Sequence, residues 1–456
     1  MTLAAHIFRE YDIRGIVGVD LDPEVTHLVG RAYGSVLRET LGGTGGRVAV
    51  GQDNRPHSPA LAQGLMEGLM ATGVDVVSLG TVPTPLALWA ENRLGLDGAI
   101  QITGSHNPSE YNGIKITVQG RSFFGVAIQD LLKRIQEDRF LEGSGSLTHK
   151  AIIPTYVEEI AKGFQLTQPV RVVVDCGNGV GSLVAVDLLE AIGAEVIPLY
   201  CESDGTFPNH HPDPTVDEYL VDMIDLVRER KADLGIAFDG DADRIGAVDE
   251  NGCVVRGDIL LLLFGLDILE TRGPGQKLVF DVKCSQVLPE VFGAAGGEPI
   301  MWRTGHSHIK ARMKDIGASL GGELSGHICF ADKYIGIDDA PYDACRLVDL
   351  LARKKQSLSE MVAELPHYVS TPEIRIEVDE EQKWDVVERA LEHFRMSHEV
   401  IDVDGARVLF GDGWGLLRTS NTQPVIVARF EARTPERLAE IKNLMGSWLE
   451  TQGIHV

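Results

Sequence analysis

The sequence lacks the features that mark a secreted, membrane-bound or nucleic-acid-binding protein. Its six cysteines form no Cys-x-x-Cys pair and no closely spaced framework, which is typical of reduced thiols in a cytoplasmic protein. No apolar run is long enough to span a bilayer, and residues 1–14 contain no apolar signal-peptide core. Asp and Glu outnumber Lys and Arg by 67 to 42, and the net charge of −25 disfavours polyanions as partners. We therefore expect a soluble, cytoplasmic protein without a nucleic-acid or membrane partner.

Loops that bind nucleotides are missing as well. The chain has no Gly-Lys-Ser/Thr loop of the Walker type, and no Gly-x-Gly-x-x-Gly follows a predicted strand. Apolar residues make up 44% of the chain, which is enough to fold. With 456 residues the chain is too long for one hydrophobic core, so we expect two to four domains.

A weak internal repeat indicates the architecture. Three segments begin with a basic residue, continue as an apolar strand and reach an Asp; they are residues 47–53, 171–175 and 277–281. Each is followed by a helical segment that leads into a second strand, over residues 61–79, 183–199 and 287–302. Short apolar runs that alternate with helical segments predict βαβ units and an α/β fold with mixed, largely parallel sheets.

Clusters of turn-forming residues predict the domain boundaries. Three related α/β domains are expected over residues 1–148, 149–252 and 253–366. A smaller α+β domain is expected over residues 367–456, with a strand at 373–378 and helices at 384–394 and 435–449.

Each α/β unit has a third strand that ends in a polar cluster. These strands cover residues 98–103, 233–238 and 318–322. Ligands of open α/β sheets bind beyond the carboxyl ends of the strands. We therefore expect the domains to surround one central cleft.

The cluster after the second of these strands is a row of carboxylates. Asp239, Asp241 and Asp243 alternate with small residues, and such close carboxylates repel one another unless a cation joins them. Oxygen ligands alone suit Mg²⁺ or another hard cation. A calcium loop of the EF-hand type is an alternative, although Arg244 replaces its required Gly; an acidic surface turn without metal is another.

Ser105 is the candidate nucleophile, within Thr103-Gly-Ser-His-Asn-Pro108. A serine between Gly and His at a strand end has an exposed hydroxyl and a proton-transferring neighbour. The same sequence is also ordinary for a structural turn, and both interpretations stand from the residues alone. A divalent metal elsewhere in the chain would favour phosphoryl transfer.

Two further clusters could recognise a phosphorylated sugar. In Gly321-Gly-Glu-Leu-Ser-Gly-His327, Glu323 and Ser325 could bind sugar hydroxyls and His327 could act as acid or base; a glycine-rich loop with an incidental His is the alternative. Arg418-Thr-Ser-Asn-Thr422 could bind phosphate, or could be a polar hairpin loop. Basic residues that could add local positive charge are Arg14, Lys115, Arg244, Lys283, Arg303, His306 and His308.

Five motifs together resemble those of the α-D-phosphohexomutases, most closely the bacterial phosphomannomutase/phosphoglucomutase branch. In chain order they are Phe8-Arg-Glu-Tyr-Asp-Ile-Arg-Gly15, Thr103-Gly-Ser-His-Asn-Pro108, Asp239-Gly-Asp-Ala-Asp-Arg244, Gly322-Glu-Leu-Ser-Gly-His327 and Arg418-Thr-Ser-Asn-Thr422. The resemblance covers essentially the whole chain and implies four domains around a deep cleft.

The resemblance implies that the chain interconverts hexose 1-phosphates and 6-phosphates of mannose or glucose. Ser105 would be phosphorylated and joined through one Mg²⁺ to the three Asp residues, and a hexose 1,6-bisphosphate would be the intermediate and activator. The implied catalytic residues are Ser105, His327, Lys115 and Arg14. The implied substrate-binding residues are Tyr11, His106, Asn107, Arg244, Lys283, His306, Glu323, Ser325, Arg418, Ser420, Asn421 and Thr422.

Some positions depart from the family pattern. Ala242 replaces a common Gly in the metal loop, and residues 51–55 match a Gly-Arg-Asp segment so loosely that no role is assigned to them. Leu324 favours mannose and glucose over glucosamine as the sugar. The alternatives are a phosphoglucosamine mutase, a sugar-phosphate phosphatase and an inactive sugar-phosphate-binding protein. The protein is expected to be a monomer or a homodimer.

Overall fold

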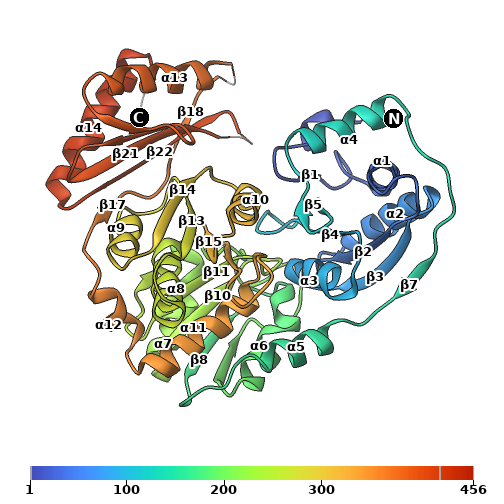
Figure 1. Cartoon of the computed structure of the whole chain (residues 1–456), viewed down its shortest axis with the longest axis horizontal. Coiled ribbons are helices and arrows are strands. Elements are labelled where there is room, and N and C mark those ends of the chain that lie inside the picture. Colours follow the sequence, from blue (N-terminus) through green and yellow to red (C-terminus); the bar gives the residue numbers. More distant parts are fainter. Residues whose placement is uncertain (1–2, 380, 421–422, 455–456) are drawn as a thin grey trace. The chain divides into compact units, whose positions relative to one another are not determined.

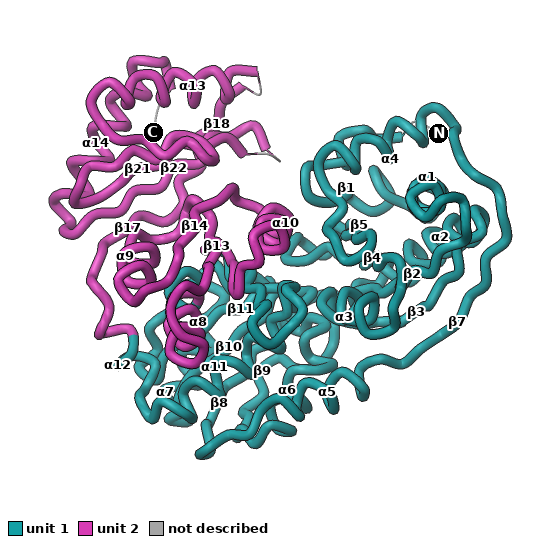
Figure 2. Tube along the Cα trace, in the orientation of Figure 1, with its two compact units in different colours: residues 1–260, 325–361 teal, residues 261–324, 362–456 magenta. Residues whose placement is uncertain are grey.

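The computed structural model describes residues 3–379, 381–420 and 423–454, and the chain divides into two compact units (Figure 2). Unit 1 comprises residues 1–260 and 325–361, and unit 2 comprises residues 261–324 and 362–456. The chain passes between the units within α8 (Gly257–Arg272), after Leu324 and within α12 (Leu358–Ala363). None of the described helices is both long and apolar enough to cross a membrane.

The first sheet of unit 1 mixes parallel and antiparallel strands (Figure 1). Its order is β1-β5-β4-β2-β3-β7, with β6 beside β5. The strands are β1 (Ile13–Ile16), β2 (Arg47–Gln52), β3 (Asp75–Thr81), β4 (Gly98–Ile102), β5 (Tyr111–Val118), β6 (Arg121–Ser122) and β7 (Leu147–His149). The 3₁₀ helix η1 (Ala5–Ile7) and the helices α1 (Pro23–Thr40), α2 (Ser58–Ala71), α3 (Thr84–Leu94) and α4 (Val126–Gln136) accompany them. β2 is parallel to β3 and β4, whereas β5 is antiparallel to β1 and β4, so β5 brings side chains of its own to the carboxyl end of β4.

The second sheet of unit 1 has the order β12-β11-β10-β8-β9. Its strands are β8 (Arg171–Asp175), β9 (Glu195–Leu199), β10 (Leu234–Phe238), β11 (Ile245–Asp249) and β12 (Val254–Val255). The other elements of this part are α5 (Ile153–Ala161), η2 (Val180–Leu183), α6 (Ala185–Ala191), η3 (Asp217–Leu220), α7 (Val221–Arg230), β16 (Ile328–Phe330) and α11 (Ala340–Lys354). β10 is parallel to β8 and antiparallel to β11, so the turn from β10 to β11 lies at the carboxyl end of β10.

Unit 2 contains the third α/β repeat and the C-terminal α+β elements. In the repeat, β13 (Lys277–Asp281) is parallel to β14 (Glu298–Trp302) and β15 (Leu320–Gly322). The C-terminal sheet has the order β17-β22-β21-β20-β19, with β18 beside β22. Its strands are β17 (Val369–Ser370), β18 (Ile374–Glu377), β19 (Glu399–Ile401), β20 (Ala406–Leu409), β21 (Gly413–Thr419) and β22 (Val425–Ala432). The helices that lie wholly within unit 2 are α9 (Val287–Ala294), α10 (His306–Ile316), α13 (Gln382–Arg395) and α14 (Pro435–Thr451).

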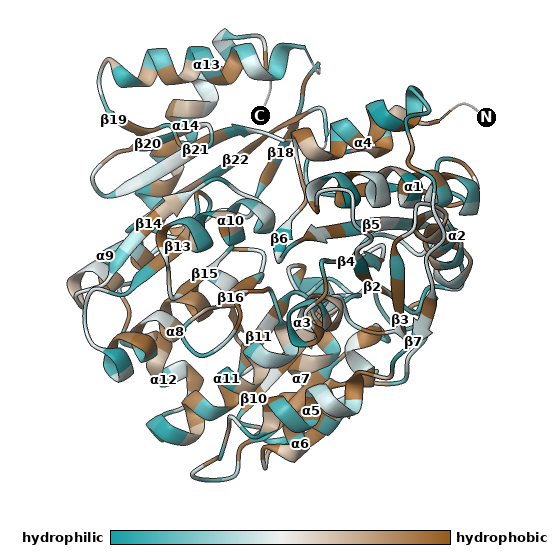
Figure 3. Ribbon diagram, turned by 45° about the vertical axis from the view of Figure 1, so that its right-hand side comes forward, coloured by the Kyte–Doolittle hydropathy of each residue, from teal (hydrophilic) through white to brown (hydrophobic). Residues whose placement is uncertain are grey.

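Local sequence explains where the elements begin and which of them are buried. Asp22 caps α1 by accepting a hydrogen bond from the backbone of Val25, and Thr434 caps α14 in the same way. A proline follows each cap, where its missing N–H costs nothing. Figure 3 shows β3 as hydrophobic along most of its length, as expected for a strand inside a sheet with covered faces.

The predicted repeat is confirmed strand by strand. The first strands of the three repeats are β2, β8 and β13, the second are β3, β9 and β14, and the third are β4, β10 and β15. The predicted C-terminal pattern is also confirmed, since β18, α13 and α14 occupy the expected residues. The boundaries between the four predicted domains remain predictions.

Candidate active site and metal centre

Ser105 lies in a tight loop directly after β4 and is almost fully buried, with 2% of its surface exposed. Its backbone φ is 49°, in the left-handed region that residues with a side chain rarely adopt. The backbone N–H of Ser105 donates to Thr103 Oγ1 at 2.9 Å, and that of Asn107 donates to the Gly104 carbonyl at 2.9 Å. Such a conformation persists only where the surroundings enforce it, and it is most frequent at functional sites.

The hydroxyl of Ser105 points to a carboxylate. Its Oγ donates to Asp239 Oδ2 at 2.9 Å and lies 3.1 Å from His106 Nδ1. Burial lowers the pKa of His106 well below its usual value of 6.5, and the positive charges of Arg244 and Arg14 lower it further. These effects favour the neutral form of His106, and the serine hydroxyl donates its hydrogen bond to Asp239.

Asp239, Asp241 and Asp243 form a buried carboxylate cluster in the turn between β10 and β11; each is 0% exposed. One oxygen atom of each lies within 4.8 Å of the others. From β5, Lys115 Nζ donates to Asp241 Oδ2 at 2.7 Å and to Asp243 Oδ2 at 2.5 Å. Burial raises the pKa of Asp239, and the neighbouring carboxylates raise it further. Burial also opposes the charge on Asp241, but Lys115 and Thr84 hold its pKa below the usual value.

The donor set of this cluster fits a divalent cation. Within the described part of the chain, Asp241 Oδ1 and Asp243 Oδ1 are buried side-chain oxygens that accept no hydrogen bond. Buried carboxylate oxygens are costly unless a donor or a cation satisfies them, and oxygen ligands alone suit a hard cation. The cluster can therefore bind a metal, with the Ser105 hydroxyl directly beside it.

Two alternatives for the acidic motif are wrong. An exposed acidic turn is excluded because none of the three carboxylates is exposed. An EF-hand loop is excluded because the antiparallel strands β10 and β11, and not helices, flank the motif.

His327 lies beside the same cluster. Arg244 Nε donates to His327 Nε2 at 3.0 Å, so this ring nitrogen carries no proton in this arrangement. On the other side of the ring, Nδ1 lies 3.3 Å from Asp338 Oδ2 and 3.6 Å from Asp243 Oδ1. These distances place the ring of His327 against two carboxylates of this centre.

Arg14 approaches the Ser105 loop from the neighbouring strand β1. Its Nη1 donates to Asn107 Oδ1 at 2.9 Å and to the Gly104 carbonyl at 3.4 Å, and its Nη2 donates to Asp12 Oδ2 at 2.5 Å. Because β1 and β5 are adjacent and antiparallel, Arg14 and Lys115 lie on neighbouring strands near one loop. These two residues place positive charge next to the Ser105 loop, although the net charge of the whole chain is −25.

Unit 1 thus contains the larger share of the predicted site. Its members are Tyr11, Arg14, Ser105, His106, Asn107, Lys115, Asp239, Asp241, Asp243, Arg244, Ser325 and His327. Tyr11 lies in the turn before β1, and Ser325 lies two residues before His327.

Unit 2 carries further basic groups of the prediction. Lys283, which follows β13, forms an ion pair with Glu373 at 2.6 Å and lowers the pKa of that carboxyl to about 2. Arg418, at the end of β21, is 6% exposed and pairs through Nε with Asp404 at 3.0 Å. Both basic groups are largely buried and paired with carboxylates, and Lys283 also lies 3.9 Å from Asp281. Buried basic groups of this kind are suited to binding an anion.

The start of α10 belongs to this part of unit 2. Asp404 Oδ2 accepts a hydrogen bond from the Thr304 backbone at 3.0 Å, and Glu323 Oε1 accepts one from the Gly305 backbone at 2.6 Å. His306 is the first residue of α10, where the helix dipole is positive. Ser420 directly follows β21, and the predicted residues Asn421 and Thr422 lie outside the described part of the chain.

Several residues near these groups were not singled out by the sequence. They are Thr84, which donates to Asp241 at 2.5 Å, together with Asp338, Glu373 and Asp404. The segment of Asp53, to which no role was assigned, also reaches the Ser105 loop. Asp53 directly follows β2, as Asp239 directly follows β10. Its position at the carboxyl end of a strand could therefore have indicated a role at the site.

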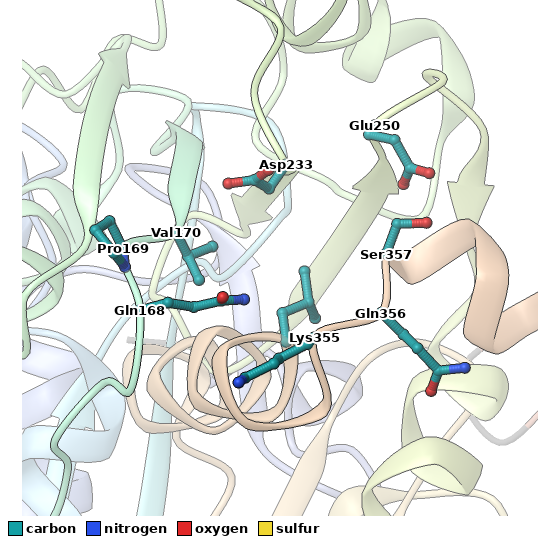
Figure 4. A pocket seen from close by; sticks show the side chains of 9 residues that line it. Gln168, Pro169, Val170, Asp233, Glu250, Lys355, Gln356 and Ser357 are labelled. Carbon is teal, nitrogen blue, oxygen red and sulfur yellow. The ribbon is translucent and has the colours of Figure 1, made fainter.

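A small cavity of ≈ 210 Å³ in unit 1 lies at another edge of the second sheet (Figure 4). Its lining residues are Gln168, Pro169, Val170, Asp233, Glu250, Leu351, Lys355, Gln356 and Ser357. Val170 precedes β8 and Asp233 precedes β10, so the cavity is at the amino ends of two parallel strands. Because the carboxylate cluster follows the carboxyl end of β10, this cavity is not part of the candidate site.

Comparison with protein families matches four consecutive models to this chain. They are described as phosphoglucomutase/phosphomannomutase alpha/beta/alpha domain I at residues 5–142, domain II at 154–252, domain III at 256–368 and the C-terminal domain at 373–445.

Individual relatives agree with these models. The phosphomannomutase/phosphoglucomutase of Pseudomonas aeruginosa is 45% identical over 451 residues, which cover 98% of this chain and 96% of that protein. The phosphoglucomutase of Neisseria gonorrhoeae is 41% identical over 456 residues, 99% of this chain and 98% of the relative. A crystal structure of a phosphoglucomutase/phosphomannomutase family protein from Burkholderia thailandensis superposes with a TM-score of 0.90 at 41% identity, covering 97% of this chain and 96% of that one.

Proposed function

The chain belongs to the phosphoglucomutase/phosphomannomutase family, and on that premise we propose that it interconverts the 1-phosphate and 6-phosphate of mannose, glucose or both. The observation that carries the proposal is the hydrogen bond from Ser105 Oγ to Asp239 Oδ2, which joins a nucleophile to a buried carboxylate cluster. A serine beside a divalent-metal site is suited to accept and donate a phosphoryl group.

In the proposed reaction, Ser105 carries a phosphoryl group in the resting enzyme. A hydroxyl of the sugar phosphate attacks this phosphorus, the bond from phosphorus to Ser105 Oγ breaks, and a hexose 1,6-bisphosphate forms. The bisphosphate turns around and returns its other phosphoryl group to Ser105, so no phosphate is released. As its bond to phosphorus breaks, Ser105 Oγ takes up one proton from solvent, in place of the one that the attacking hydroxyl lost. Between the two transfers it donates to Asp239 as it does in this structure, and it gives this proton up again when it attacks the bisphosphate.

A metal and a base complete the chemistry. Asp239, Asp241 and Asp243 would hold one Mg²⁺, which would neutralise charge on the phosphoryl oxygens during transfer. We assign His327 as the group that takes the proton of the attacking hydroxyl and later returns it, because its ring lies beside the carboxylate cluster, 3.6 Å from Asp243. Arg14 and Lys115 complete the proposed catalytic residues.

Substrate recognition is assigned to both units. Glu323 and Ser325 would bind two neighbouring sugar hydroxyls away from carbon 2, which would let glucose and mannose both bind. Arg418, Ser420, Asn421 and Thr422 would bind the phosphate that does not react. The remaining proposed substrate-binding residues are Tyr11, His106, Asn107, Arg244, Lys283 and His306. We also propose the cytoplasm as its location, in keeping with the reduced state of all six cysteines.

The mass of the intact protein tests the role of Ser105. We expect wild-type protein to carry one phosphoryl group on Ser105 and Ser105→Ala to carry none and to have no mutase activity, even with bisphosphate supplied. A Ser105→Ala variant with wild-type turnover would contradict the mechanism. Net release of inorganic phosphate from the wild type would indicate a phosphatase instead.

Coupled assays on mannose, glucose and glucosamine 1-phosphates test the sugar. We expect the highest kcat/KM for mannose or glucose 1-phosphate, because Leu324 separates Glu323 from Ser325. A markedly higher value for the glucosamine compound would assign the chain to the phosphoglucosamine mutases.

A further inference from the structure

Asp53 and Arg55, which follow β2, form a buried ion pair beneath the Ser105 loop. Arg55 is 1% exposed and Asp53 is 2% exposed. Arg55 Nε donates to Asp53 Oδ2 at 3.1 Å, and the Arg55 backbone N–H donates to Asp53 Oδ1 at 3.1 Å. Ser58 Oγ donates to the same Asp53 Oδ1, so the carboxylate is fixed from both sides.

The other two nitrogens of the Arg55 guanidinium donate to backbone carbonyls of one loop, and the Phe207 ring lies over the group, with its centroid 5.0 Å from Cζ. Nη2 donates to the carbonyls of Ser105 at 2.9 Å and Asn107 at 2.6 Å. Nη1 donates to the carbonyls of Pro108 at 2.6 Å and Tyr111 at 3.2 Å. With Nε on Asp53, all five N–H groups that a guanidinium offers are used.

Asp53 also binds this loop directly, through Oδ2, the oxygen that accepts from Arg55 Nε. The backbone N–H of Gly104 donates to Asp53 Oδ2 at 3.0 Å. The loop passes so close to the guanidinium that a Cβ at Gly104 would lie 2.5 Å from Arg55 Cζ. The pair therefore holds the backbone on both sides of the Ser105 peptide.

Ser105 needs such a support because of its backbone conformation. Its φ of 49° is unfavourable for a residue with a side chain unless the surroundings impose it. Several carbonyl dipoles that converge on one point repel one another unless a cation lies there. Arg55 supplies that cation, and the loop that results aims Ser105 Oγ at Asp239.

We propose that Asp53 and Arg55 are positioning residues for phosphoryl transfer, acting through the backbone of residues 104–111. Among the described residues, neither side chain forms a hydrogen bond with the Ser105 hydroxyl or with the carboxylate cluster. Their proposed effect is to keep Oγ pointing at the metal-binding carboxylates. This inference rests on the proposed role of Ser105 as the phosphoryl donor. A displacement of about 1 Å at a reacting atom can cost roughly 100-fold in rate.

The substitutions Arg55→Lys, Arg55→Gln and Asp53→Asn test the proposal in the full-length enzyme. Lysine keeps the charge but has three donors and no fork, so it can serve only part of the loop. We expect Arg55→Gln to lower the single-turnover rate of phosphoryl transfer by about 100-fold, with KM for the hexose phosphate changed by less than about threefold. Arg55→Lys should recover part of the rate, and Asp53→Asn should fall between them.

Arg38→Gln is the matched control. Arg38 also donates to backbone carbonyls, those of Thr72 at 2.7 Å, Glu142 at 3.1 Å and Gly43 at 3.2 Å, and it lies in the same part of unit 1. Its loss should lower thermal stability without changing the transfer rate. A purely structural role of Arg55 would give the same result for both arginines.

Amide hydrogen exchange over residues 104–111 gives a readout that does not depend on activity. We expect these amides to lose protection in Arg55→Gln and Arg55→Lys but not in Arg38→Gln. A folded Arg55→Gln or Arg55→Lys enzyme with wild-type transfer rate and protection would overturn the inference. Wild-type protein without a phosphoryl group on Ser105 would instead contradict the proposed function, so the two failures are distinct.

Discussion

Lys115 Nζ lies 2.7 Å from Asp241 Oδ2, so a fixed positive charge lies within a cluster of three buried carboxylates. The lysine comes from β5 and the aspartate from the turn after β10, so the two sheets of unit 1 contribute opposite charges to one centre. The ammonium group offsets part of the repulsion among the carboxylates while leaving Oδ1 of Asp241 and of Asp243 available to a metal.

We expect Lys115→Met to make folding depend strongly on a divalent cation. Removal of one partner from a buried ion pair typically costs about 3–5 kcal/mol, because the remaining charge is left uncompensated. Without metal, the variant should therefore melt well below the wild type. Added Mg²⁺ should raise its Tm more than that of the wild type.

Lys162→Met is the control for this experiment, because the ammonium of Lys162 pairs with Glu158 in solvent, and both side chains are exposed. Thermal melts of all three proteins, with Mg²⁺ or with a chelator, give the comparison. Equal Mg²⁺ dependence in the wild type and Lys115→Met would show that the lysine does not compensate the carboxylates.

Thr84→Val should weaken metal binding without altering the metal-binding carboxylates themselves. Thr84 Oγ1 donates to Asp241 Oδ2 at 2.5 Å and so orients that carboxylate. Loss of a hydrogen bond that orients a metal ligand typically costs roughly 10–100-fold in affinity. Titration of Mg²⁺ by calorimetry measures the change.

Thr40→Val provides the comparison for Thr84→Val, since Thr40 Oγ1 donates only within its own helix, to the Val36 carbonyl. Its Mg²⁺ affinity should equal that of the wild type. An unchanged affinity in Thr84→Val would mean that Asp241 keeps its orientation without the threonine.

The contribution of His210 to stability should depend on pH. Burial opposes the charge on His210, but the hydrogen bond and the charge of Asp175, 3.0 Å away, raise its pKa above 6.5. A raised pKa means that the folded state binds the proton more tightly than the unfolded state. The stabilisation is therefore complete below the unfolded pKa of about 6.5 and is lost as the pH rises through the folded pKa.

Urea unfolding between about pH 5.5 and pH 8.5 tests this. We expect the loss of stability in His210→Gln to be largest at the acidic end and to shrink as the pH rises. In an Asp175→Asn background this pH dependence should disappear. A loss that grows with pH would reverse the sign of the linkage.

Asp404→Asn should weaken binding of the hexose phosphate but leave Ser105 phosphorylated. Asp404 holds both Arg418 Nε and the Thr304 backbone, so its charge fixes the arginine of the proposed phosphate loop. A mispositioned arginine should raise KM by about 10-fold with a smaller effect on kcat. Steady-state kinetics and intact mass measure the two quantities.

Asp412→Asn controls for the loss of a carboxylate, since Asp412 pairs with Arg437 and is 53% exposed. Its KM should match that of the wild type. If Asp404→Asn lowers kcat and leaves KM unchanged, Asp404 acts on the transfer step and not on phosphate binding.

The sequence was sufficient to predict the strands and the clusters at their ends. β2, β8 and β13 each carry an apolar run that reaches an Asp or the residue before one, and a helical segment follows each of them. The turn from β10 to β11 could also be predicted, because three carboxylates in alternation have few other uses. These features depend on residues close together in the chain.

The interactions that orient the side chains of the site could not be predicted from the sequence. Arg55 binds the carbonyls of Ser105 and Asn107, and carbonyl groups leave no pattern in a sequence because every residue has one. Asp338 reaches His327, and Asp404 reaches Arg418, through loops whose paths follow from packing. Long-range contacts of this kind become visible only in the folded chain.

The most direct test of the account follows a labelled phosphoryl group from Ser105. Enzyme phosphorylated on Ser105 with a radiolabel is isolated and mixed with one equivalent of unlabelled hexose 1-phosphate in the presence of Mg²⁺. We expect the label to appear first in a hexose 1,6-bisphosphate and then in hexose 6-phosphate, with none in inorganic phosphate. Label that stays on Ser105 while hexose 6-phosphate forms, or label that is released as inorganic phosphate, would contradict the account.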